Sequence, residues 1–113
     1  VLSSKFDPTI RHYGVDIVSA ESDAPIKAVL EGTVTLATWT SDEGHIIYLQ
    51  HKYNLISVYK HNSMLLKKAG DKVGVGEAIA IVGSSGELST GPHLHLELWH
   101  NGDAINPSDY IIF

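Results

Sequence analysis

The sequence predicts an all-β fold, a compact antiparallel sandwich or barrel of short strands, and three observations carry this prediction. Apolar residues alternate with polar ones over several short segments, as they do in half-buried strands. Turn-forming residues, chiefly glycine and asparagine, separate these segments. Residues 63–69 form the only segment with helical features, and it is at most two turns long. Short strands with frequent turns are typical of β-sandwiches and barrels.

The expected strands follow one another along most of the chain. They are rich in β-branched and aromatic residues or alternate in polarity, and they span residues 26–30, 33–37, 45–51, 55–61, 78–82 and 93–99. Residues 52–54 have hairpin length, with Asn54 the expected residue at positive φ, and Asn101-Gly102 predicts a second hairpin. The expected helix over 63–69 ends before Gly70.

Length, charge and composition exclude several classes of protein. The chain has 113 residues and a mass of 12.3 kDa, which suits a single domain over residues 1–113. A net charge of −5 argues against nucleic-acid binding, which needs a basic surface. The absence of cysteine excludes disulfides and thiolate sites, whereas seven histidines indicate imidazole chemistry. No apolar run approaches the ~18 residues of a membrane span, and the start at Val1 without a targeting pattern indicates a mature or excised domain.

Residues 91–97 carry the first candidate site. On a strand, His93, His95 and Glu97 share one face, while the intervening leucines point into a core. Two imidazoles one strand step apart lie close enough to serve one metal centre, although His-x-His by itself is a weak signal. Glu97 is either a partner that orients one of these imidazoles or a solvated strand residue.

Residues 12–16 carry the second candidate site. Gly14 and the β-branched residues after it disfavour a helix, so His12 and Asp16 share a face of an extended segment, with Gly14 leaving space between them. One aspartate and two histidines would supply the three protein ligands of a catalytic zinc site. The alternative is an Asx-turn with a solvated histidine. His61 ends an expected strand, and a lone histidine there is more often a surface residue. The remaining histidines are expected to be structural or solvated, and they are His45, His51 and His100.

Three motifs therefore follow one another along the chain. His-x-Gly-x-Asp lies at residues 12–16, Tyr-x-His at 59–61 and Ser-Thr-Gly-Pro-His-x-His at 89–95. This order resembles the lysostaphin/LytM-type zinc metallopeptidases, which cleave peptide bonds in bacterial peptidoglycan. The resemblance covers about residues 6–110 and includes the glycine-containing turn at 72–76 and the closing Asn106-Pro107.

The resemblance implies a LytM-type fold with a duplicated hybrid motif, one Zn²⁺ per chain, and a peptidoglycan peptide as substrate. It implies that His12, Asp16 and His95 are the zinc ligands, and that His61 and His93 are unliganded active-site histidines. All five positions hold the residue type of the family. The resemblance also implies a periplasmic or extracellular location and allows an upstream domain outside this sequence. Departures from the family pattern at 43–45 and 87–88 fall on expected groove loops, where they affect substrate preference.

The implied site predicts hydrolysis through a metal-activated water. Two neutral imidazoles and one carboxylate leave zinc with one net positive charge, which brings a bound water toward a pKa of ~7. His61 and His93 jointly serve as general base or acid and as oxyanion stabilisers, with the division between them open. Because the acidic chain does not attract carboxylate-bearing peptidoglycan, recognition is expected from strand-edge hydrogen bonds to an extended peptide. Tyr13, Trp39 and Tyr59 are candidate lining residues, although core packing is the default for an aromatic side chain.

Four other functions stay open. A catalytically silent LytM-type module that binds or activates a cell-wall hydrolase would have lost ligands. A phosphocarrier of a related β-sandwich also pairs two histidines, but it leaves His12 and Asp16 without a joint purpose. A biotin- or lipoate-carrying domain needs a lysine at an exposed hairpin tip. A structural zinc domain needs a fourth ligand, which His93 could supply, so zinc content alone does not exclude it.

Overall fold

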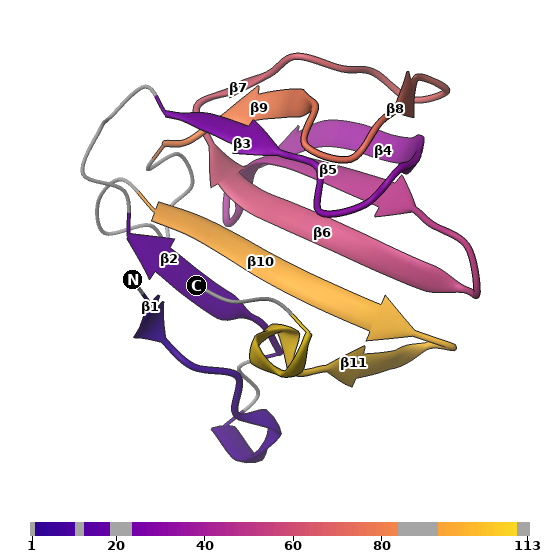
Figure 1. Ribbon diagram of the computed structural model, residues 1–113. Helices are drawn as coiled ribbons and strands as arrows, with labels where there is room; N and C mark the ends of the chain where they lie inside the picture. Colours follow the sequence, from indigo (N-terminus) through magenta and orange to yellow (C-terminus); the bar gives the residue numbers. More distant parts are fainter. Residues whose placement is uncertain (1, 11–12, 19–23, 84–92, 111–113) are drawn as a thin grey trace.

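The structure is a computed structural model that describes residues 2–10, 13–18, 24–83 and 93–110. Its strands form two antiparallel sheets, and the smaller sheet lies against one face of the larger one (Figure 1). The larger sheet has the order β1-β2-β10-β6-β5-β4-β8, and β11 pairs with β10. Its strands are β1 (Leu2–Ser4), β2 (Val15–Val18), β4 (Gly32–Thr40), β5 (Gly44–Gln50), β6 (Leu55–Asn62), β8 (Lys72–Val73), β10 (His93–His100) and β11 (Asp103–Ile105).

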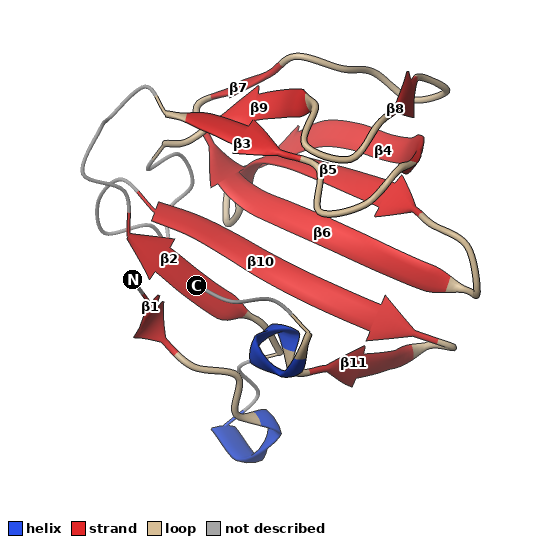
Figure 2. Cartoon of the chain, viewed as in Figure 1, coloured by secondary structure: helices blue, strands red, loops and turns tan. Residues whose placement is uncertain are grey.

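The smaller sheet completes the all-β architecture that the sequence predicts. Its order is β3 (Pro25–Lys27), β9 (Ala78–Ile81) and β7 (Met64–Leu65). Among the described residues, helical structure is limited to two single-turn 3₁₀ helices, η1 (Pro8–Ile10) and η2 (Pro107–Asp109) (Figure 2). No helix in this part of the chain is long and apolar enough to cross a membrane.

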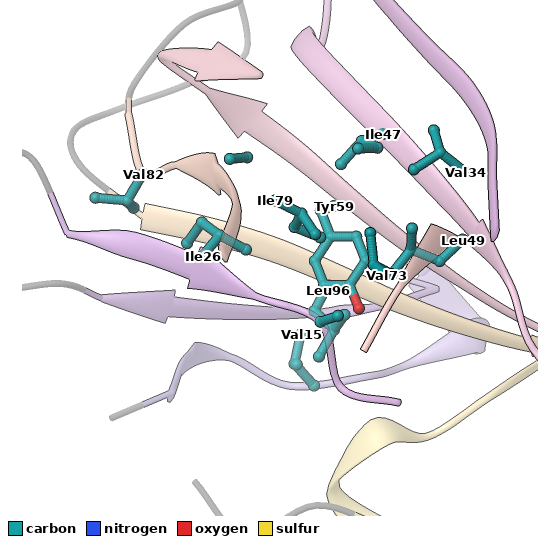
Figure 3. Packing of buried hydrophobic residues seen from close by; sticks show 12 residues of the cluster. Val15, Ile26, Val34, Ile47, Leu49, Tyr59, Val73, Ile79, Val82 and Leu96 are labelled. Carbon is teal, nitrogen blue, oxygen red and sulfur yellow. The ribbon is translucent and has the colours of Figure 1, made fainter. Parts of the chain in front are cut away.

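The hydrophobic core lies between the two sheets, where Tyr59 of β6 packs among aliphatic side chains (Figure 3). On β10, Leu96 and Leu98 are buried, as the alternation of the sequence predicts. The core cluster draws on both sheets and consists of Val15, Ile26, Ala28, Val34, Ile47, Leu49, Tyr59, Val73, Ile79, Ala80, Val82 and Leu96. The other face of β10 is thereby left for the polar residues between the leucines.

The helix expected over residues 63–69 is wrong. Met64–Leu65 is strand β7, which pairs with β9 in the smaller sheet. The Ser63 N–H donates to the Ile81 carbonyl and the Leu66 N–H to the Ile79 carbonyl, both at 2.9 Å. These backbone groups are satisfied by a distant strand, so tertiary pairing overrides the local helical preference.

Two tight turns lie next to each other at one end of the larger sheet. Tyr53 and Asn54 have φ of 63° and 57°, and Asn101 and Gly102 have φ of 51° and 86°. Positive φ at both central residues is the pattern of a type I′ hairpin turn, so both hairpin predictions are confirmed. The Asn54 side-chain amide donates to Asn101 Oδ1 at 3.1 Å, which ties the two hairpins together.

A buried hydrogen-bond chain connects His51 to the core. His51 Nδ1 lies 2.7 Å from the Glu31 carbonyl, which can only accept, so the Nδ1–H donates to it. At the other end, the Val29 N–H donates to the Tyr59 hydroxyl at 3.1 Å. Ser57 Oγ lies between, 2.9 Å from the Tyr59 hydroxyl and 2.7 Å from His51 Nε2. His51 is therefore a structural residue, as expected, and Tyr59 is a core residue rather than a groove residue.

Candidate metal and catalytic site

Three neighbouring strands, β2, β10 and β6, position the candidate site (Figure 1). In their register, His95 of β10 lies opposite Asp16 of β2 on one side and opposite Lys60 of β6 on the other. Asp16 Oδ1 lies 2.6 Å from His95 Nδ1, and both side chains are largely buried. The structure thus brings together two of the three predicted zinc ligands, although 79 positions separate them in the sequence.

Glu97 holds the other side of the His95 ring. Its Oε2 accepts from His95 Nε2 at 2.8 Å and from Lys60 Nζ at 3.0 Å, and its Oε1 accepts from Trp99 Nε1 at 2.8 Å. Glu97 is only 7% exposed, so its interpretation as a solvated strand residue is wrong. A carboxylate that holds a ring nitrogen in this way fixes both the tautomer and the orientation of the imidazole.

Burial and charge have opposite effects on these two groups. Burial alone would lower the pKa of His95, but its hydrogen bonds to Asp16 and Glu97 raise it to about 9. Burial alone would raise the pKa of Glu97, but the His95 hydrogen bond and the charge of Lys60 lower it to about 2. The two shifts therefore favour an ionised Glu97 carboxylate beside a protonated His95 ring.

The donor atoms suit zinc. With Nε2 of His95 held by Glu97, Nδ1 is the ring nitrogen that faces Asp16. An imidazole nitrogen beside a carboxylate oxygen is the kind of donor set that Zn²⁺ takes. The third predicted ligand, His12, lies outside the described residues. Within the described ranges, no three histidine, aspartate or glutamate side chains form a complete metal-binding group.

Gly14 explains the middle position of the His-x-Gly-x-Asp motif. A Cβ added there would lie 2.5 Å from the Leu96 carbonyl oxygen, and 2.8 Å from both Glu97 Cγ and His95 Nε2. Real Cβ atoms do not approach other atoms so closely. The missing side chain of Gly14 therefore makes room for the paired side chains of His95 and Glu97 on the neighbouring strand β10.

His61 reaches the site through a bulge in β6. Between His45 and Ile47 of β5, the register shifts so that two residues of β6 oppose one of β5. His61 has a φ of 66°, in the left-handed region, and its N–H donates to the Glu43 carbonyl at 2.9 Å. Bulges and left-handed residues of this kind occur preferentially next to functional sites, where they redirect a side chain.

The rings of the two predicted catalytic histidines lie close together. The His61 and His93 ring centroids are 5.2 Å apart, and the His61 and His95 centroids are 6.1 Å apart. His93 is half-buried, whereas His61 is 8% exposed. Three imidazoles and the Asp16 carboxylate therefore share one region of the sheet.

Sequence reasoning missed two residues of this region, Lys60 and Glu43. Lys60 Nζ pairs with the carboxylates of both Glu97 and Glu43. A lysine at the middle position of the Tyr-x-His motif, directly before the candidate catalytic histidine, is the signal that could have identified Lys60. Trp99 also takes part, through its hydrogen bond to Glu97 and a contact with the Tyr13 ring at a centroid distance of 6.0 Å.

A cavity of about 490 Å³ lies away from these residues. Its lining includes Leu55, Leu98 and Ile105, and it contains none of the predicted ligands or catalytic histidines. Burial and hydrogen-bond geometry, rather than this cavity, identify the candidate site among the described residues.

Comparisons with known proteins agree with the fold and with the motifs. A family model described as Peptidase family M23 matches residues 10–107. The catalytic domain of lysostaphin from Staphylococcus simulans is similar in structure, with a TM-score of 0.79, 33% identity, and coverage of 88% of this chain and 77% of that one. The predicted lysostaphin-type resemblance and the all-β fold are confirmed.

Curated relatives include both a peptidase and an activator. The chain is 36% identical to the peptidoglycan DD-endopeptidase ShyC of Vibrio cholerae, over 85% of this chain and 22% of the relative. It is 31% identical to the murein hydrolase activator EnvC of Escherichia coli, over 92% of this chain and 27% of the relative. The chain thus spans about a quarter of the length of these relatives. Because the family model matches nearly the whole chain, this protein belongs to peptidase family M23.

Proposed function

We propose that this domain is a zinc-dependent endopeptidase that hydrolyses peptide bonds in the cross-links or stems of bacterial peptidoglycan. The observation that carries the proposal is the 2.6 Å approach of Asp16 Oδ1 to His95 Nδ1, beside the imidazoles of His61 and His93. The similarity to peptidoglycan endopeptidases supports the substrate class. A substrate of this kind places the domain in the periplasm or outside the cell.

His12, Asp16 and His95 would hold one Zn²⁺ in this proposal. When bound, zinc supplies a Lewis acid that polarises a carbonyl and lowers the pKa of a water molecule. Glu97 contributes by keeping the proton of His95 on Nε2, so that Nδ1 presents its lone pair on the side of Asp16. The charge on Asp16 then offsets part of the charge of the cation.

His61 and His93 would move protons between water and the departing amine. A histidine exchanges a proton readily near neutral pH, and two rings 5.2 Å apart can serve the same reacting group. The ring that is protonated can also donate a hydrogen bond to the oxygen that develops negative charge. The bulge in β6 and the Glu43 carbonyl keep the His61 backbone in place while this occurs.

The similarity to EnvC suggests a second candidate, a module that activates a separate cell-wall hydrolase. Such a module has no need of a metal ligand set or of additional active-site histidines. This chain retains the residue type that the proposed catalysis requires at all five positions, which are His12, Asp16, His61, His93 and His95. This retention favours the peptidase.

Digestion of purified cross-linked muropeptides by the isolated chain separates the two functions. The peptidase converts cross-linked dimers into monomers without any other protein, and mass spectrometry of the products identifies the bond that is cut. An activator leaves the muropeptides unchanged and instead accelerates a separate cell-wall hydrolase acting on intact peptidoglycan. Muropeptides in which neither a cross-link nor a stem bond has been cut after incubation with zinc-loaded protein would rule out the endopeptidase.

A further inference from the structure

Lys60 lies on β6 between the strand of His95 and the turn at residues 41–43. Its side chain is only 17% exposed, and Nζ pairs with Glu43 and with Glu97, the latter at 3.0 Å. Burial alone would lower the pKa of Lys60, but hydrogen bonds and charge interactions with the two glutamates raise it above its usual value. The side chain is therefore a buried ammonium group that needs both carboxylates, and it fixes the position of each.

One of these carboxylates leads to His95. Glu97 Oε2 accepts hydrogen bonds from both Lys60 Nζ and His95 Nε2. Because the two donors share one oxygen, a displacement of Lys60 moves the atom that holds the His95 ring. Trp99 donates only to the other oxygen, Oε1, so its hydrogen bond does not by itself fix the position of Oε2.

The other carboxylate leads to His61. The side chain of Glu43 pairs with Lys60, and the carbonyl of the same residue accepts the His61 N–H at 2.9 Å. The Glu43 N–H donates to Thr40 Oγ1 at 3.0 Å, which fixes the turn from its other end. A histidine with a φ of 66° occupies a sparsely populated backbone region, so its conformation depends on contacts of this kind.

We propose that Lys60 is the positioning residue of the site, fixing the ring of His95 through Glu97 and the backbone of His61 through Glu43. The proposal rests on the proposed function, since that function makes His95 a zinc ligand and His61 a catalytic residue. The rival interpretation is an ion pair that only stabilises the sheet. The two interpretations differ in what they predict for zinc binding.

The test replaces Lys60 by methionine, which keeps the length of the side chain and removes the charge. By electrostatics alone, removing the positive charge of Lys60 would tighten the binding of a cation, because it removes a repulsion. Loss of positioning would instead weaken the binding, and residues whose hydrogen bonds orient a metal ligand typically contribute about 10-fold or more to affinity. We expect Lys60→Met to raise the zinc dissociation constant, measured by chelator competition, about 10-fold. We also expect a lower kcat on muropeptides at little changed KM.

Two further variants serve as controls. Lys60→Arg keeps the charge and can pair with both glutamates, so it should recover most of the lost zinc affinity. Lys67→Met removes another lysine–glutamate pair, Lys67 with Glu77 at 2.6 Å, and should leave zinc affinity unchanged. Zinc affinity of Lys60→Met that equals or exceeds that of the unmodified protein would overturn the proposal, whatever its thermal stability.

A double-mutant cycle tests the route through Glu97. In a Glu97→Gln background, the effect of Lys60→Met on zinc affinity should shrink toward none, because both substitutions break one chain. An undiminished effect would contradict the assigned route. If Lys60→Met does not fold, Glu43→Gln takes its place, and unchanged zinc affinity and kcat in that variant would overturn the proposal. A failure of the unmodified protein to bind zinc would instead refute the proposed function.

Discussion

At the scale of single residues, Gly14 shows how closely the first motif and β10 are fitted. The contacts of 2.5 and 2.8 Å that a Cβ would make involve the Leu96 backbone and the paired side chains of His95 and Glu97. The backbone oxygen cannot move away without disturbing the sheet. The site therefore depends on a residue that has no side chain to contribute.

We expect Gly14→Ala to cost about 1–3 kcal/mol in the free energy of unfolding, as overpacked positions do. The same substitution should weaken zinc binding, because the Cβ would displace the His95–Glu97 pair. Gly74→Ala is the matched control, since the nearest atom to its Cβ is Glu77 Oε1 at 3.9 Å. Denaturant titration and chelator competition measure the two effects. Equal unfolding free energies and zinc affinities in the two alanine variants would contradict the prediction that a Cβ at position 14 crowds the His95–Glu97 pair.

Tyr59 gives a pH prediction at the same scale. Burial raises the pKa of Tyr59 above its usual value, and the hydrogen bonds of its hydroxyl with Ser57 and with the Val29 N–H oppose this only in part. A pKa that is higher in the folded than in the unfolded protein stabilises the fold below about pH 10, and this contribution is lost as the pH rises further. The difference in absorbance at 295 nm between the unmodified protein and Tyr59→Phe follows this group. We expect its midpoint above pH 10 and coincident with unfolding, and a midpoint below 10 would contradict the burial.

At the scale of elements, the hairpin between β5 and β6 carries an unfavourable residue. Tyr53 has a φ of 63°, in the left-handed region, and its side chain is 87% exposed. Packing of the side chain therefore does little to offset the cost of this backbone conformation. A left-handed L-residue costs roughly 1–2 kcal/mol, whereas glycine loses only 0.5–1 kcal/mol of chain entropy, roughly, on being fixed. Tyr53→Gly should therefore stabilise the protein by about 0.5 kcal/mol. Thermal unfolding measures the change, and a lower melting temperature would show that the Tyr53 ring makes a stabilising contact.

The elements also show where sequence reasoning succeeds and where it fails. The long strands β4, β5, β6 and β10 overlap segments predicted from composition and alternation, and Asn54 and Asn101-Gly102 have the chemistry of their turns, so local sequence was sufficient there. The short strands β1, β8 and β11 were not predicted. Residues 63–69 contain good helix formers, but their backbone pairs with β9. Whether such a segment forms a strand depends on a partner at residues 78–81, and no local pattern contains that information.

At the scale of the whole molecule, the larger sheet brings together motifs that are distant in the sequence. The pairing of β2, β10 and β6 could be expected only from the family resemblance, because strand order is not contained in periodicity. It places Asp16, His95 and Lys60 across neighbouring strands. The shared face of His95 and Glu97 follows from alternation alone. The contact of Lys60 with Glu97 and the left-handed backbone of His61 could not be predicted, since both arise from register and from a bulge.

The central claim is that three residues bind zinc and two further histidines act beside it. Elemental mass spectrometry of zinc per chain tests this most directly in purified variants that have been stripped with chelator and reconstituted. We expect about one zinc in the unmodified protein, in His61→Ala and in His93→Ala, and almost none in His12→Ala, Asp16→Ala and His95→Ala. His61→Ala and His93→Ala should nevertheless lose about 10²–10⁴-fold in turnover. Equal zinc loss in all five variants, or no zinc in the unmodified protein, would contradict the claim.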